Sequence, residues 1–76
     1  MQHYAEVILP LALPQNYTYS IPPLMVHEVV VGKRVIVQFG KRKLYTALVS
    51  AIHQQAPKDF KPKDILEVED QAPIIG

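Results

Sequence analysis

The sequence predicts a small, mainly β domain: a single-domain barrel or half-barrel of about five short strands, OB-like at most. Seven prolines and three glycines divide the 76 residues into short segments, which disfavours long helices. Hydrophobic residues make up 49% of the chain and charged residues 20%, a composition typical of folded domains rather than disordered ones. Several segments alternate apolar and polar residues with the period of two that favours half-buried strands. A closed or nearly closed sheet would limit the exposed edges of such short strands.

The first two strands are predicted before residue 22. Residues 3–9 alternate in part, and Pro10 ends the segment. Residues 14–16 form a turn. Residues 17–21 then place Tyr17, Tyr19 and Ile21 on one face and two hydroxyl residues on the other. The pair of prolines at 22 and 23 ends this strand.

The clearest strand covers residues 34–39, where Val35, Val37 and Phe39 alternate with more polar positions after a turn at Gly32. A second strand over 44–52 follows a loop at 40–43, which predicts a hairpin. A polar connection over 57–63 leads to a last short strand over 65–68. We expect the domain to cover residues 1–70, and residues 71–76 to begin a linker.

Charge is unevenly distributed along the chain. All eight basic residues lie between positions 33 and 63 with a single acid, so this stretch carries +7, whereas the remainder carries −6. Such segregation can create a local positive surface that attracts a polyanion although the net charge is only +1. The alternative is that solvated loops are simply rich in lysine.

Several chemistries lack sequence support. Without cysteine there is no disulfide, thiolate nucleophile or cysteine-containing metal site. Gly32-Lys33 does not fit a P-loop, and the three histidines lack the spacing of a metal site. We therefore predict a binding module with no catalytic residue, no metal and no cofactor of its own. The apolar run at 7–13 is broken by Pro10, so neither a signal peptide nor a membrane partner is expected, and the predicted location is cytoplasmic.

An ordered series of short motifs covers nearly the whole chain. It consists of a Leu-Pro segment, an aromatic-x-Tyr segment, a Gly-x-Arg-Val-x-Val-x-Phe-Gly-Lys segment and a closing Glu-Val-x-Asp, at residues 7–14, 17–22, 32–41 and 67–70. This series resembles the start of the PriA family of bacterial replication-restart helicases, also called primosomal protein N′. The resemblance implies a 3′ DNA-binding domain that holds the 3′-hydroxyl end of the nascent leading strand at a stalled fork.

The family's end-binding pocket maps by this resemblance onto Tyr17, Thr18, Gly40 and Lys63. An aromatic side chain lets a terminal base pack without base selectivity, and glycine allows a ligand to approach the backbone. Well-known members carry Asp at the position of Thr18, so weaker selection of a free 3′-hydroxyl, or selection through backbone groups, is expected here. Electrostatic support for the DNA backbone is predicted from four further residues: Lys41, Arg42, Lys43 and Lys61.

Alternatives remain open for several of these positions. Tyr17 can be a core residue, Gly40 can serve only a turn, and Lys63 can be an ordinary solvated lysine. Tyr45 and Phe60 either stack on bases or pack in the fold. At the level of function, the alternative is a small β-barrel that binds a peptide strand or a partner protein.

The resemblance also implies what the rest of such a protein would contain. ATP, magnesium and zinc belong to downstream domains of an ATP-dependent 3′ to 5′ DNA helicase, so this chain is not expected to be an enzyme and Gly76 is expected to be the edge of a fragment. The implied partners are single-stranded or forked DNA with a free 3′ end, the downstream helicase domains, and, through the full-length protein, single-stranded DNA-binding protein and other primosome proteins.

Overall fold

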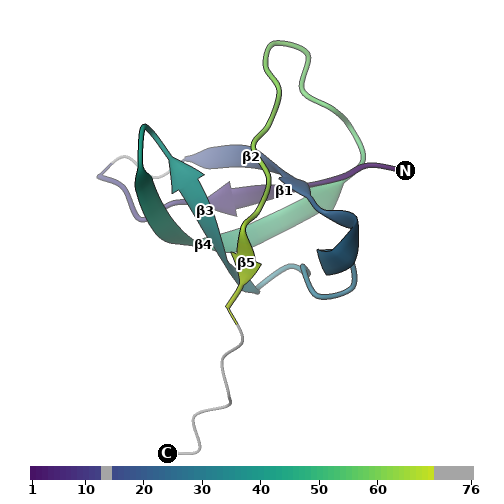
Figure 1. The fold of residues 1–76 in the computed structure, drawn as a ribbon, viewed down its shortest axis with the longest axis horizontal. Coiled ribbons are helices and arrows are strands. Elements are labelled where there is room, and N and C mark those ends of the chain that lie inside the picture. Colours follow the sequence, from purple (N-terminus) through teal and green to yellow (C-terminus); the bar gives the residue numbers. More distant parts are fainter. Residues whose placement is uncertain (13–14, 70–76) are drawn as a thin grey trace, which may run out of the picture.

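The computed structural model describes residues 1–12 and 15–69, and these form one curved antiparallel sheet (Figure 1). The sheet has five strands in the order β2-β1-β4-β3-β5. Their bounds are β1 His3–Ile8, β2 Asn16–Ile21, β3 Arg34–Phe39, β4 Lys43–His53 and β5 Glu67–Val68. A single turn of 3₁₀ helix, η1 Pro23–Met25, follows β2. In the described part of the chain no helix is long and apolar enough to cross a membrane.

Period-two alternation divides the strands into an inner and an outer face. On β2 and β3 the odd-numbered residues face inward, and they pack with alternate residues of β1 and β4. The buried core consists of Ala5, Val7, Leu9, Tyr19, Ile21, Val29, Val35, Val37, Ala47, Val49 and Ile65. The even-numbered residues of β1 to β3 lie on the outer face. Among them Ser20 is buried, because the segment that leads to β5 covers it.

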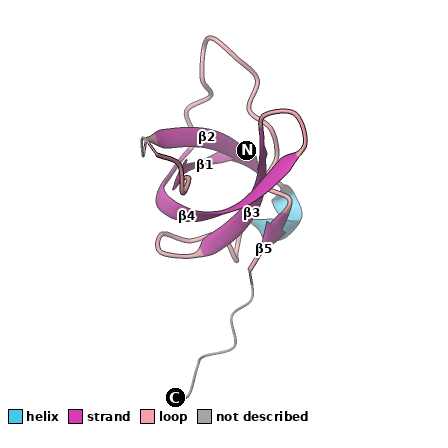
Figure 2. Cartoon of the chain, turned by 90° about the vertical axis from the view of Figure 1, so that its left-hand side faces the viewer, coloured by secondary structure: helices cyan, strands magenta, loops and turns pink. Residues whose placement is uncertain are grey.

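The long strand β4 gives the sheet its curvature. Its first half pairs with β3 and its second half pairs with β1, with a change of register between Glu6 and Val7 of β1. An irregularity of this kind increases local twist and bends the strands. The sheet therefore curls into a half-barrel, as Figure 2 shows from the side.

Two sets of contacts partly close the half-barrel between its edges. The Ser20 N–H donates to the Lys63 carbonyl and the Ile65 N–H donates to the Ser20 carbonyl, both at 2.9 Å. The Tyr19 hydroxyl donates to the Gln38 carbonyl at 2.7 Å and so links β2 to β3 across the interior. Beyond these contacts, towards the start of β2, the seam between β2 and β3 stays open and holds a pocket.

The predicted half-barrel is confirmed, with differences at the ends of strands. β3 has its predicted bounds, and β4 extends one residue further at each end because it pairs with two neighbours. The last strand is shorter than predicted, since Ile65 packs in the core while the chain crosses from Ser20 to β3. The helical turn η1 was not expected from a pair of prolines. Pro14 of the predicted turn and the predicted linker at 71–76 lie outside the described residues.

Candidate functional site

A pocket of about 400 Å³ opens at the seam between β2 and β3. Three segments that are distant in sequence form it: the start of β2, the end of β3 with the following turn, and the loop that leads to β5. A volume of this size lies in the range of small-molecule sites. The lining residues are Asn16, Tyr17, Thr18, Tyr19, Gln38, Phe39, Gly40, Phe60, Lys61 and Lys63.

Aromatic side chains form the apolar wall of the pocket. The half-buried rings of Tyr17 and Phe39 meet edge to face, with centroids 4.8 Å apart and planes at 64°. The Tyr17 hydroxyl accepts a hydrogen bond from Gln15 Nε2 at 2.7 Å, which anchors the outer end of its ring. Burial is the main cause of the raised pKa of Tyr19, and the neighbouring Tyr17 adds to it. The Tyr19 hydroxyl donates to the Gln38 carbonyl, and both residues line the pocket. Phe60 lies on the loop side and is 55% exposed.

Two basic side chains and a glycine also line the pocket. Lys61 and Lys63 are both exposed, and Lys63 Nζ donates to the Gly40 carbonyl at 3.4 Å. Gly40 has a φ of 75°, which L-residues rarely adopt, and a Cβ built on it would meet no atom within 4 Å. The glycine thus serves the hairpin turn and also leaves open space beside the pocket, where a ligand can approach the backbone.

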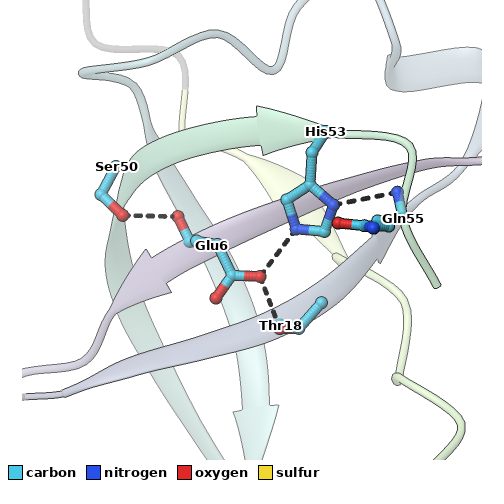
Figure 3. Close-up of polar contacts among 5 residues, drawn as sticks. All are labelled: Glu6, Thr18, Ser50, His53 and Gln55. Carbon is cyan, nitrogen blue, oxygen red and sulfur yellow. Dashed lines mark hydrogen bonds and ion pairs between the residues drawn. The ribbon is translucent and has the colours of Figure 1, made fainter. Parts of the chain in front are cut away.

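Thr18 lines the same pocket, but its hydroxyl is engaged elsewhere. Thr18 Oγ1 donates to Glu6 Oε2 at 2.5 Å on the outer face of the sheet (Figure 3). Ser20 directs its N–H and C=O away from β1, towards Lys63 and Ile65. Because alternate residues of a strand present their backbone groups to the same side, the N–H and C=O of Thr18 also face this outer edge of β2. Thr18 therefore offers backbone groups to the pocket rather than its hydroxyl.

The outer face carries a polar cluster around Glu6. His53 Nε2 donates to Glu6 Oε2 at 2.8 Å, and the Gln55 N–H donates to His53 Nδ1 at 3.1 Å, which fixes the tautomer of the ring (Figure 3). Ser50 Oγ donates to the Glu6 carbonyl at 3.1 Å. Burial opposes ionisation of the Glu6 carboxyl, but the hydrogen bonds from His53 and Thr18 outweigh it, so its pKa is lowered.

A second hollow adjoins the pocket on the side of the β3–β4 hairpin. It has a volume of about 580 Å³ and shares Phe39 and Gly40 with the pocket. Its other lining residues are Lys41, Arg42, Lys43 and Tyr45. The three cations are exposed, and in the described part of the chain none of them makes an ion pair. Tyr45 is half-buried, with its ring edge to face with Phe39 at 6.3 Å between centroids.

The four residues that the family resemblance placed in an end-binding pocket lie close together in the fold. Tyr17, Thr18, Gly40 and Lys63 line one cavity, and Lys61 lies there too. The remaining predicted basic residues line the adjoining hollow. Sequence reasoning did not assign Phe39 to the site, because its alternation with Val35 and Val37 is that of a core residue. The Glu6–His53 contact gave no sequence signal, since the two residues are 47 positions apart and meet only through the pairing of β1 with β4.

A β half-barrel with an aromatic and basic pocket at its open seam has features typical of small nucleic-acid-binding modules. The family model of the PriA 3′ DNA-binding domain (3′BD) matches residues 6–76, and the chain belongs to that family. The resemblance seen in the sequence is thereby confirmed, and the domain is a DNA-binding domain. Neither the curated proteins nor the solved structures give a significant match.

Proposed function

We propose that this domain captures the 3′-hydroxyl end of the nascent leading strand at stalled replication forks, as part of a replication-restart helicase. The observation that carries the proposal is the pocket at the β2–β3 seam, where an aromatic wall, an open glycine and two lysines converge. A terminal base can stack on Tyr17, and its phosphate can lie near Lys61 and Lys63.

Selection of a free 3′ end follows from the groups that this pocket presents. Its volume of about 400 Å³ can take a terminal nucleotide, with Thr18 of the β2 edge in its lining. A 3′-hydroxyl can both donate and accept a hydrogen bond, and the exposed edge of β2 at Thr18 supplies backbone N–H and C=O groups suited to it. A terminal 3′-phosphate is larger and offers acceptors without the matching neutral donor. Because no carboxylate takes part through Thr18, the expected preference is modest.

The experiment compares two oligonucleotides that differ only at the 3′ end, one with a free hydroxyl and one with a phosphate. We expect tighter binding of the free end in a fluorescence anisotropy titration. The titration is repeated at a second salt concentration, because phosphate contacts weaken with salt whereas apolar contacts to a peptide strand do not. Equal affinity for both ends would contradict end capture, and the absence of salt-dependent DNA binding would favour the protein-interaction alternative.

In the full-length protein this domain would act beside an ATP-dependent 3′ to 5′ helicase motor. The downstream domains would bind ATP and magnesium. The full-length protein would contact single-stranded DNA-binding protein and other primosome proteins in the cytoplasm of a bacterium. We expect this chain alone to release no phosphate from ATP, with or without DNA. Malachite-green detection on the purified chain tests this, and activity that survives further purification would contradict it.

A further inference from the structure

The hollow beside the end-binding pocket has the composition of a second nucleotide site. Its lining is Phe39, Gly40, three consecutive cations at 41–43, and Tyr45. Aromatic rings combined with a positively charged track are the two features that sequence-independent single-strand sites share. The hollow is also large enough, at about 580 Å³, to take one nucleotide.

Charge in this region lacks a counterpart within the described part of the chain. The ion pairs found there join Arg34 to Glu69 and His53 to Glu6, and neither lies in the hollow. The acids of the facing loop, Asp59 and Asp64, line neither cavity. Three cations without an acidic partner on a tight turn produce a positive potential that a phosphodiester would neutralise.

The two cavities are joined in a way that lets one strand occupy both. Phe39 and Gly40 belong to both linings. The Phe39 ring lies between Tyr17 and Tyr45, with centroid separations of 4.8 and 6.3 Å, so aromatic surface is continuous from one cavity to the other. At the boundary, the missing side chain of Gly40 leaves open space through which a sugar-phosphate backbone can pass.

We propose that this hollow binds the nucleotide that precedes the 3′ end. Its base stacks on Tyr45. The phosphate that links it to the terminal nucleotide lies near Gly40 and Lys63, and its own 5′-phosphate lies among Lys41, Arg42 and Lys43. The inference rests on the proposed function, because it takes the terminal nucleotide to occupy the pocket at Tyr17. A strand that leaves this pocket follows the unpaired positive charge of the hairpin turn, and the site accepts any base because stacking uses the face common to all of them.

The test is a length series of 5′-phosphorylated thymidine oligonucleotides of one, two and three residues, each with a free 3′-hydroxyl. By isothermal titration calorimetry we expect a gain of about tenfold or more from one to two residues, and a smaller gain from two to three. Tyr45→Leu keeps apolar bulk in the fold but removes the ring, and it should remove most of the first gain. Leu44→Ala, at an exposed neighbour on the outer side of the same strand, is the matched control and should retain it.

The charge contribution is tested separately with the double variant Lys41→Gln and Lys43→Gln. It should lower the gain from one to two residues and reduce its salt dependence. Lys58→Gln removes an exposed lysine that lines neither cavity and should change neither quantity. Melting temperatures establish that each variant is folded.

Failure of this inference can be told apart from failure of the proposed function. Equal affinity for one and two residues, or a gain that persists in Tyr45→Leu, would overturn the second site. The proposed function is read from the mononucleotide alone, by comparing a free 3′-hydroxyl with a 3′-phosphate. A missing end preference with the length gain intact would count against end capture and would support a nucleotide site at Tyr45.

Discussion

Neighbouring residues of β2 take part in two quite different regions of the molecule. Tyr17 points inward to a pocket whose open rim carries exposed lysines, whereas the hydroxyl of Thr18 points outward into a cluster with Glu6 and His53. In the outer cluster, the polar groups bind one another. The carboxylate of Glu6 accepts hydrogen bonds from Thr18 and His53, and its backbone carbonyl accepts one from Ser50. The pocket leaves its charge and aromatic surface available. The difference indicates that the cluster holds β1, β2 and β4 together, while the pocket is the part suited to a ligand.

The largest expected effect comes from removing the aromatic ring of Tyr17 from the pocket. Tyr17→Leu should weaken binding of a free 3′ end by about 1 to 3 kcal/mol, because it removes the stacking surface. Tyr17→Phe keeps the ring, loses only the bond from Gln15, and should bind nearly as the parent does. Anisotropy titrations with open and phosphate-blocked oligonucleotides measure both variants.

The matched control for the ring lies on the outer face. Tyr4 is also half-buried and stacks on His53 with centroids 5.9 Å apart. Tyr4→Leu should leave DNA binding unchanged. A Tyr17→Leu protein that melts as the parent does and still distinguishes the two ends would show that the terminal base does not stack there.

In the described part of the chain, two glycines have a positive φ, and they provide a second comparison of similar size. Gly40→Ala and Gly32→Ala both place a side chain at a left-handed position, with φ of 75° and 91°, and each should lower the free energy of unfolding by about 1 to 2 kcal/mol. Only Gly40 borders the two cavities, so only Gly40→Ala should also weaken DNA binding. Urea denaturation and anisotropy measure the two effects. Equal binding by the two folded variants would remove Gly40 from the interface.

The strands were the most predictable part of the fold. The alternation of Val35, Val37 and Phe39 gave β3 its bounds, because a period of two is a local property of the sequence. The length of β4 was less predictable, since its ends depend on pairing with two other strands. The same holds for Ile65, whose place in the core is set by contacts with Ser20, far away in the chain.

The sequence identified several residues that line the candidate pocket, but not the geometry of the pocket. Family motifs pointed to Tyr17, Gly40 and Lys63, and the structure gathers them around one cavity. The direction of the Thr18 hydroxyl could not be obtained in this way, because it depends on Glu6 lying opposite in the β1–β2 register. A continuous aromatic surface from Tyr17 to Tyr45 likewise requires the curvature of the sheet, which no local pattern encodes.

A smaller effect is expected when the outer cluster is altered at Thr18. Thr18→Val keeps the shape of the side chain and the backbone groups at the pocket but removes the donor to Glu6. The free energy of unfolding should fall by about 0.5 to 1.5 kcal/mol, while the preference for a free 3′ end should not change. Urea denaturation and paired anisotropy titrations test this. A clear loss of end preference would show that the hydroxyl leaves Glu6 to contact the DNA.

The smallest effect concerns acid pH and Glu6. Burial opposes ionisation of the Glu6 carboxyl, but its hydrogen bonds with His53 and Thr18 lower its pKa below the ordinary value of 4.5. A carboxyl with a lowered folded-state pKa stabilises the fold fully above its unfolded-state pKa, and this contribution is lost as the pH falls through the folded-state pKa. The stability difference between the parent and Glu6→Gln should therefore be constant near neutral pH and shrink once the pH falls below about 4.5.

Thermal melts of both proteins from neutral to acid pH measure this difference, and carboxyls common to the two proteins cancel in it. Glu28→Gln is the matched control, because Glu28 is exposed and none of the hydrogen bonds or ion pairs found in the described part of the chain involves its carboxylate. Its difference from the parent should stay flat over the same range. A Glu6→Gln difference that is equally flat would mean that His53 and Thr18 do not favour the ionised carboxylate, and that the outer cluster holds the strands through uncharged contacts alone.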